Sequence, residues 1–538
     1  MVQFFWLVLI PVFTSVILLL LPLKPGKVLA LFVQVALGII GILGFLYVRS
    51  HGSQIQSIGG WPQQVGILLR GELFSLNMVL LSTLMFFFIF IYNWHKDYVD
   101  KAFLMLLLVF QGMVNGIFLS IDLFNIFVLV ELSTVVISIL IVYKQEKRSI
   151  YDGIVYMMTN IVAMSFFLFG LGILYKTTGV IDLLSLKAHM QNQGNAASLI
   201  LPYAFIITGV SLKSALMPLF SWLPKAHGTP GAPTVVSAIL SGLYVKCGVY
   251  LFYRIQQVFQ PAIDTRELFL VLGLITAVVG FLLAIAQKDI KLILAYHTVS
   301  QIGLIMTGMN MENLYANQGA LYHIINHALF KATLFLTAGM LIDHHGTREV
   351  ARIRGVWREK PLLAAATLMT VLGITGAPLF NGSISKYWIG YGASEAWINN
   401  ALFLVNLGTI ISFVKYSGML WGQPQPGTAR IRSTPSERLM TAVVLTMGVL
   451  CLLGGILSEP LTQILFGASM PIAWVEYWQK ALLFLLTLLA GVAIYYGILR
   501  RWSFLQKPKG FELTFNGISM SIGVFFVFMV VYLTIQYY

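Results

Sequence analysis

Five lysines lie inside long apolar stretches of this 538-residue chain, where a charged side chain is unusual. They are Lys213, Lys246, Lys331, Lys386 and Lys415. An ammonium group near the middle of a bilayer costs about 2.5–3.5 kcal/mol on insertion scales, so such groups face a protein-lined interior and need polar partners. The five lysines therefore indicate a polar path within the membrane.

Glu131 is the carboxylate best placed to pair with one of these lysines. It lies in the middle of an apolar stretch, where an isolated carboxylate would take up a proton, so we expect it to be ionised beside Lys213. Movement of Glu131 toward or away from Lys213 would then load or release a proton. A neutral Glu131 that only holds helices together is the alternative. Asp122 is expected to be a helix-terminal residue with at most an accessory role.

A second polar group consists of His323, His327 and Lys331, which are four residues apart in turn. This spacing places them on one face of a helix, over about 12 Å at 1.5 Å per residue. We interpret the group as a segment of a proton relay. A structural histidine pair and a metal site are the alternatives, although lysine is a poor third metal ligand and no cysteine is near. His297 is an accessory candidate for a proton access path, or a packing histidine.

The composition excludes a soluble enzyme. Hydrophobic residues make up 58% of the chain and charged residues 10%, against about 25% charged in soluble domains. The two cysteines, Cys247 and Cys451, are far apart, so they predict neither a disulfide framework nor an iron–sulfur or zinc site. No nucleotide-binding motif is present, and we expect an ion translocase subunit with no cofactor, no metal and no redox or hydrolytic site of its own.

Apolar runs of about 20 residues, each long enough to cross a bilayer, recur along the whole chain and predict an all-α polytopic membrane protein. Sixteen spans are expected, near residues 3–22, 28–48, 73–93, 102–119, 124–143, 154–175, 199–220, 232–253, 267–286, 290–309, 318–342, 362–391, 397–421, 439–458, 479–499 and 514–536. The first has no basic region before it and no cleavage site after it, which indicates an anchor that is retained.

The basic residues predict the orientation of these spans. Of the 34 Lys and Arg, 22 fall in loops after odd-numbered spans and 7 in loops after even-numbered ones. By the positive-inside rule, both termini of this cell-membrane protein are expected outside. The net charge of +14 thus mainly reflects the orientation of the spans in the lipid bilayer. It does not indicate nucleic-acid binding.

The spacing of the buried lysines suggests an internal repeat. Lys213 and Lys386 are 173 residues apart, and Lys246 and Lys415 are 169 apart. The chain would then comprise N-terminal helices in 1–100, a first five-helix repeat in 101–255, a second, inverted repeat in 265–422, and three helices in 438–538. Inverted repeats of this kind are common in secondary transporters.

Both repeats contain residues that interrupt helices. Pro218 follows Lys213 in the seventh span, and Pro378 precedes Lys386 among several glycines in the twelfth. Breaks at equivalent places in two halves point to an ion site at the repeat interface. We therefore expect broken helices at these two spans.

Several ordered stretches resemble the antiporter-like subunits of respiratory complex I and of Mrp-type multisubunit sodium/proton antiporters. They are Asp122–Glu131, Leu212–His227, Ala232–Lys246, Leu294–Gly303 and His323–Lys331. The resemblance covers roughly residues 70–460 and implies about fourteen core transmembrane helices. The two C-terminal spans are then additional, and Lys415 has no clear counterpart in the family.

The resemblance also implies roles for individual residues. Glu131 and Lys213 would form a controlling ion pair, and Lys246 would bridge the first half-channel. The group of His323, His327 and Lys331 matches a central histidine motif. Lys386 matches the lysine of the broken twelfth helix from which protons leave.

Local sequence favours one branch of this family. The residues around Lys246 and His297 resemble the D-type component of Mrp antiporters, and Lys386 replaces a glutamate of some complex I subunits. We therefore expect a proton-translocating subunit within a hetero-oligomeric membrane complex, with Na⁺ carried elsewhere in the assembly. The alternatives are a subunit of a redox-driven complex, such as complex I or a membrane-bound hydrogenase, a subunit of an inorganic carbon uptake system, and a membrane scaffold.

Overall fold

A computed structural model describes residues 3–61, 66–193, 196–424, 434–501 and 512–538. The helices of the first half are α1 (Trp6–Leu20), α2 (Leu23–His51), η1 (Ile58–Gly60), α3 (Leu73–Tyr92), α4 (Lys101–Leu119), α5 (Leu123–Ile141), α6 (Lys147–Thr178), α7 (Leu183–Gln193), α8 (Ala196–Lys213), η2 (Leu219–Ser221), α9 (Trp222–Gly228), α10 (Thr234–Ile239), η3 (Leu240–Tyr244) and α11 (Val245–Phe259). Those of the second half are α12 (Arg266–Ala286), α13 (Ile290–Met309), α14 (Leu314–His345), α15 (Val356–Glu359), α16 (Pro361–Thr375), α17 (Asn381–Tyr391), α18 (Ala396–Ser417), α19 (Pro435–Ile456), α20 (Ser458–Phe466), α21 (Trp474–Ile494), η4 (Tyr495–Leu499) and α22 (Phe515–Tyr537).

The prediction of an all-helical polytopic membrane protein is confirmed. Within the described ranges, fourteen helices are long and apolar enough to cross a membrane, counting α10 to α11 as one continuous helix. Two further helices, α1 and α16, are apolar but have only 15 residues each. The fourteen long helices together with α1 and α16 correspond to the sixteen predicted spans. The twelfth predicted span is divided into α16 and α17, and this division explains why α16 is short.

A short β-hairpin is the exception to the helical pattern. Strands β1 (Gln54–Ser57) and β2 (Leu68–Gly71) pair antiparallel in the loop between α2 and α3, with Gln54 opposite Gly71. This hairpin is not apparent in the sequence, because four-residue strands leave too few positions for an alternating pattern to appear.

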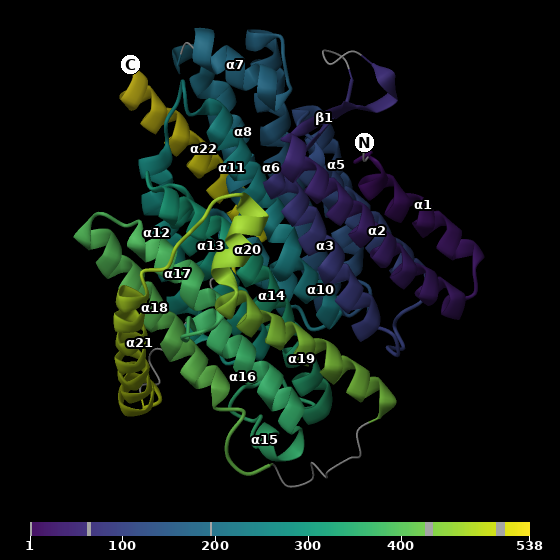
Figure 1. Ribbon diagram of the computed structural model, residues 1–538, viewed down its shortest axis with the longest axis vertical. Helices are drawn as coiled ribbons and strands as arrows, with labels where there is room; N and C mark the ends of the chain where they lie inside the picture. Colours follow the sequence, from purple (N-terminus) through teal and green to yellow (C-terminus); the bar gives the residue numbers. More distant parts are fainter. Residues whose placement is uncertain (1–2, 62–65, 194–195, 425–433, 502–511) are drawn as a thin grey trace.

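The bundle has an enclosed centre and an apolar outer ring. In Figure 1, α14 lies in the middle, α1 and α2 lie on one side, and α18 and α21 lie on the other. In the apolar windows of α13 and α14, 94% of the residues are buried inside the protein, against 17% in the window of α21 and η4. The helices that carry His297, His323, His327 and Lys331 are therefore among those shielded from lipid.

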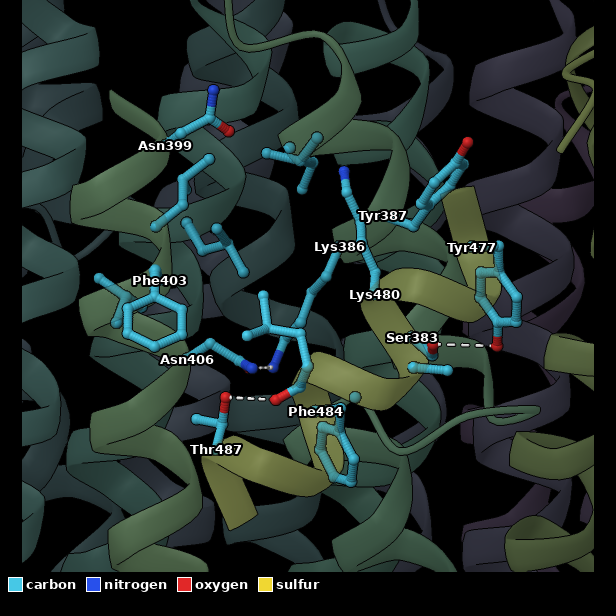
Figure 2. A pocket seen from close by; sticks show the side chains of 18 residues that line it. Ser383, Lys386, Tyr387, Asn399, Phe403, Asn406, Tyr477, Lys480, Phe484 and Thr487 are labelled. Atoms are coloured by element: carbon cyan, nitrogen blue, oxygen red, sulfur yellow. Dashed lines mark hydrogen bonds between the residues drawn. The ribbon is translucent and has the colours of Figure 1, made fainter. Parts of the chain in front are cut away.

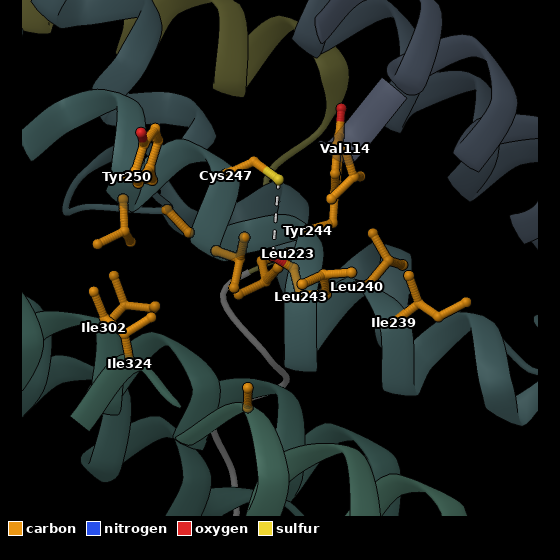
Figure 3. Packing of buried hydrophobic residues seen from close by; sticks show 14 of the residues in the cluster. Val114, Leu223, Ile239, Leu240, Leu243, Tyr244, Cys247, Tyr250, Ile302 and Ile324 are labelled. Atoms are coloured by element: carbon orange, nitrogen blue, oxygen red, sulfur yellow. Dashed lines mark hydrogen bonds between the residues drawn. The ribbon is translucent and has the colours of Figure 1, made fainter. Parts of the chain in front are cut away.

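Packing around the eighth span, which consists of α10, η3 and α11, stabilises this centre. Figure 3 shows Leu243 and Cys247 of this span in one apolar cluster with Val114 of α4, Ile302 of α13 and Ile324 of α14. All five side chains are buried. Since Lys246 is the neighbour of Cys247 in the sequence, this cluster fixes the backbone that carries a buried lysine.

Candidate functional site

Lys213 is the last residue of α8 and lies next to α5, but it does not contact Glu131 directly. Its Nζ donates a 2.7 Å hydrogen bond to Thr134 Oγ1, one turn along α5 from Glu131. Among the described residues, no ion pair joins Glu131 to Lys213, and the buried Glu131 Oε1 has no hydrogen-bond partner. The hydroxyl of Tyr244 completes the group, 3.1 Å from Thr134 Oγ1 and 2.9 Å from Ser133 Oγ. The structure thus brings the two predicted residues into one polar cluster, with Thr134 as the contact of the lysine.

The backbone leaves the helix immediately after Lys213, as the sequence predicted near Pro218. Ala215 has a φ of 54°, in the left-handed region. The indole nitrogen of Trp222 donates to Leu212 O at 2.8 Å, and the Met217 amide donates to Thr276 Oγ1 at 3.0 Å. These side chains satisfy backbone groups that the end of the helix leaves unpaired.

The eighth span is packed directly on this break. A Cβ at Gly248 would lie 2.4 Å from the carbonyl carbon of Lys213, so only glycine allows the two backbones to approach so closely. The same span contains the π-helical segment η3, a local widening that is frequent at functional sites. The buried Lys246 donates to the backbone carbonyl of Ser241 in this segment. Ser241 Oγ lies 2.7 Å from Thr298 Oγ1 of α13, so the hydroxyls continue the polar path from span eight to α13.

The predicted histidine ladder lies on α14, and both of its ends contact α13, while His323 also contacts α17. His323 Nδ1 lies 2.7 Å from Ser385 Oγ of α17, and its Nε2 lies 3.0 Å from Gln301 Oε1 of α13. The rings of His323 and His327 are nearly parallel, with centroids 6.2 Å apart. Lys331 Nζ donates to Leu294 O at 2.6 Å. The ladder therefore spans the region between α17 and the middle of the bundle.

Three buried imidazoles in this region have no hydrogen-bond partner among the described residues. They are His227, His297 and His327. His227 stacks on Phe335 of α14 with ring centroids 5.1 Å apart, and His297 lies 4.8 Å from the ring of Phe413. Sequence reasoning missed His227, although it is the last residue of the stretch Leu212–His227, which contains the break at Pro218.

Lys386 lies in the second broken helix, where α16 ends at Thr375 and α17 begins at Asn381. Pro378 lies within the break, as predicted. The two pieces are in close contact, because a Cβ at Gly382 would lie 1.9 Å from Gly373 O. Lys386 Nζ donates to Ile374 O at 2.7 Å, a carbonyl that the end of α16 leaves without a helical partner.

A cavity of about 190 Å³ adjoins Lys386 between α17, α18 and α21 (Figure 2). Lys386 also donates to Asn406 Oδ1 at 3.0 Å in this cavity. Lys480 of α21 lines it as well, with Nζ 4.8 Å from the centroid of the Tyr387 ring. Sequence reasoning missed Asn406, an uncharged residue, and it counted Lys480 with the loop residues although the predicted span 479–499 includes it. The additional helix α21 therefore forms one wall of the space beside Lys386.

Two accessory candidates lie at helix ends. Asp122 is the N-cap of α5 and accepts a 2.6 Å hydrogen bond from the Asn125 amide, in agreement with its helix-terminal interpretation. Lys415 lies in the last turn of α18 and donates to Ile285 O at 2.9 Å and to Gln287 O. Lys415 thus binds the C-terminal carbonyls of α12 and lies apart from the central cluster.

Known proteins resemble both the sequence and this fold. The D-type component of the Na(+)/H(+) antiporter of Alkalihalophilus pseudofirmus is 29% identical over 450 residues, which cover 81% of this chain and 90% of that protein. The N-type component of the NADH-quinone oxidoreductase of Desulforudis audaxviator is 30% identical over 497 residues, 86% of this chain and 98% of that protein. A chain in the structure of the Mrp complex from Dietzia sp. matches with a TM-score of 0.77 at 20% identity, covering 92% of this chain and 98% of that one.

A family model described as "NADH:quinone oxidoreductase/Mrp antiporter, TM" matches residues 120–412. This range is more than half of the chain and contains Glu131, Lys213, Lys246, Lys331 and Lys386. The chain is therefore a multi-pass membrane protein that belongs to the NADH:quinone oxidoreductase/Mrp antiporter transmembrane family.

Proposed function

We propose that this chain is the proton-translocating subunit of a multisubunit, Mrp-like cation/proton antiporter. The observation that supports this function is a row of titratable side chains, most of them buried, that begins at α5 and ends at the cavity beside α17. In order along the row they are Glu131, Lys213, Lys246, Lys331, His327, His323 and Lys386. Charged groups at membrane depth in protein-lined surroundings are typical of proton and ion pathways.

The unpartnered imidazoles favour protons as the transported species. Buried polar groups normally bind a protein atom or an ordered water molecule. Since His227, His297 and His327 bind no described protein group, their ring nitrogens are available to water molecules. Histidines joined by water can exchange protons along a chain.

The two broken helices suggest how the path is arranged. We assign residues 101–255 and 265–422 to two inverted repeats, since each contains a helix break next to a lysine, Lys213 before the first break and Lys386 after the second. With both termini outside, the cavity between α17, α18 and α21 would be the outer exit. Na⁺ would move through another subunit, because acidic oxygen ligands within the spans are few.

A redox-driven complex is the second candidate for the same proton path. The 30% identity to a component of an NADH-quinone oxidoreductase supports it. In that case the energy would come from a partner with flavin or iron–sulfur groups.

Co-purification separates the two candidates. The chain would be tagged in its native membrane, extracted gently, and its associated polypeptides identified by mass spectrometry. Small hydrophobic subunits with a second antiporter-like chain would support the antiporter, whereas flavin or iron–sulfur proteins would support the redox-driven complex.

Ion exchange tests the proton path itself. We expect Glu131→Ala and Lys213→Ala each to abolish cation/proton exchange in everted vesicles while the complex still assembles. Glu476→Ala and Lys187→Ala are matched controls, because both side chains are exposed. Unchanged exchange in the Glu131 and Lys213 variants would refute the proposed path.

A further inference from the structure

Two adjacent histidines and a glutamate meet at one corner of the bundle, outside the proposed proton path. His344 and His345 are the last two residues of α14, and Glu359 is the last residue of α15. His344 Nε2 lies 3.1 Å from Glu359 Oε2, and His345 Nε2 lies 3.8 Å from the same oxygen. One ligand atom from each residue lies within 4.8 Å of the other two.

The three residues at this corner are half-buried, and their polar side chains are largely shielded from solvent. The side chains of His345, Glu359 and His344 are 0%, 4% and 14% exposed. Both ring nitrogens of His345 lack a hydrogen-bond partner among the described residues, since 3.8 Å exceeds hydrogen-bonding distance. A buried imidazole in this state requires an explanation, such as an ion that it binds.

We propose that His344, His345 and Glu359 form a binding site for a divalent transition-metal ion of the Zn²⁺ class. Two imidazole nitrogens and a carboxylate oxygen are a ligand set that holds zinc with a fourth position open. With bonds of about 2.0–2.1 Å, tetrahedral ligands are about 3.4 Å apart, and the distances of 3.1 and 3.8 Å lie on either side of that value. The nitrogen ligands favour Zn²⁺ over Mg²⁺ and Ca²⁺, which bind oxygen.

Three basic residues close in sequence to these ligands form ion pairs with other carboxylates. Arg348 binds Asp289 at 2.7 Å, and Lys360 binds Glu437 at 2.7 Å. Arg352 pairs with Glu349 at 2.8 Å. Neither histidine takes part in these pairs.

The site would connect two elements of the proposed transport region. The helix that ends at His345 also carries His323 and Lys331, and Glu359 lies two residues before α16 begins at Pro361. A bound metal would therefore tie the end of α14 to the segment that leads into the second broken helix. Figure 1 shows α15 at the end of the bundle opposite α7.

The test measures Zn²⁺ binding to the purified full-length chain, carrying a tag without histidine and stripped of metal by a chelator. Zn²⁺ would be titrated against a chromophoric competitor at neutral pH, and the zinc-loaded protein examined by X-ray absorption. We expect one tight site per chain with two imidazole ligands. His344→Gln and Glu359→Gln should each weaken binding about 100-fold or more, whereas the exposed His51→Gln and His95→Gln should not.

A second readout guards against variants that fold poorly. Zn²⁺ should raise the melting temperature of the wild-type chain, because it binds only the folded state, and should not raise that of His344→Gln. His344 is the most exposed of the three ligands, so His344→Gln is the variant that should disturb the fold least. Absence of a tight site in the wild type, or a His344→Gln protein that binds Zn²⁺ like the wild type, would overturn the proposal.

Discussion

Lys213 Nζ lies 2.7 Å from the hydroxyl of Thr134, and Thr134 is three residues after Glu131 on the same helix. Residues three apart on a helix are neighbours on its surface. The hydroxyl therefore holds the ammonium group within the polar cluster while the carboxylate remains unbonded at Oε1. We interpret this arrangement as a state in which Glu131 and Lys213 are separated and Thr134 binds the lysine in place of the carboxylate.

This contact predicts the effect of replacing Thr134 by valine, which has the same shape but no hydroxyl. An unsatisfied buried donor costs about 1–3 kcal/mol, so we expect exchange in everted vesicles to fall about tenfold or more. Thr446→Val is the matched control, because Thr446 is exposed and bonds only its own helix. Equal exchange in Thr134→Val and Thr446→Val would show that this hydroxyl has no part in transport.

The close approach of the eighth span to Lys213 predicts a second effect. Gly248→Ala would place a methyl group 2.4 Å from a backbone carbon, which cannot move as a flexible side chain can. Overpacking of this kind costs about 1–3 kcal/mol, so we expect a lower melting temperature and weaker exchange. Gly172→Ala in α6 is the control, because its Cβ would meet nothing within 4 Å. A Gly248→Ala protein as stable as Gly172→Ala would contradict the described packing.

The cavity beside Lys386 predicts which positions water reaches. A cysteine at Ser383, which lines the cavity, should react with a membrane-impermeant maleimide, because thiols react as thiolates in contact with water. A cysteine at Thr409 of α18 should not react, since Thr409 is buried. Cys247 and Cys451 are buried and give a low background.

The side of the membrane from which this cysteine reacts also tests the orientation. With both termini outside, the Ser383 cysteine should be labelled in intact cells. Labelling only in everted vesicles would reverse the proposed topology, and labelling from neither side would show that the cavity is dry.

Hydropathy and charge predicted the spans and the broken helices because each depends on a property of one segment. Transfer of an apolar run into lipid is a property of that run, and the breaks at Pro218 and Pro378 follow from residues that interrupt helices. Partners across the bundle depend on three-dimensional contacts between segments far apart in the chain. Thr134 and Asn406 are common uncharged residues, so nothing in their local sequence marks them as contacts of Lys213 and Lys386.

The corner formed by His344, His345 and Glu359 illustrates the same limit. By hydropathy the two histidines fall in a loop, and Glu359 lies well beyond the end of their helix. A pair of adjacent histidines followed by a carboxylate is a weak signal by itself. Only the return of the chain through α15 brings the three side chains within 4.8 Å.

The stacking of His227 on Phe335 allows a proton relay to be distinguished from packing. His227→Phe preserves an aromatic ring against Phe335 and removes two buried nitrogens that have no described protein partner. Since loss of unsatisfied polar groups does not destabilise a core, we expect the variant to assemble and to melt at or above the wild-type temperature. If His227 passes protons, exchange should nevertheless fall about tenfold or more, in line with the loss of a positioned acid–base group. The exposed His51→Phe serves as the control, and a His227→Phe protein with wild-type exchange would assign His227 to packing alone.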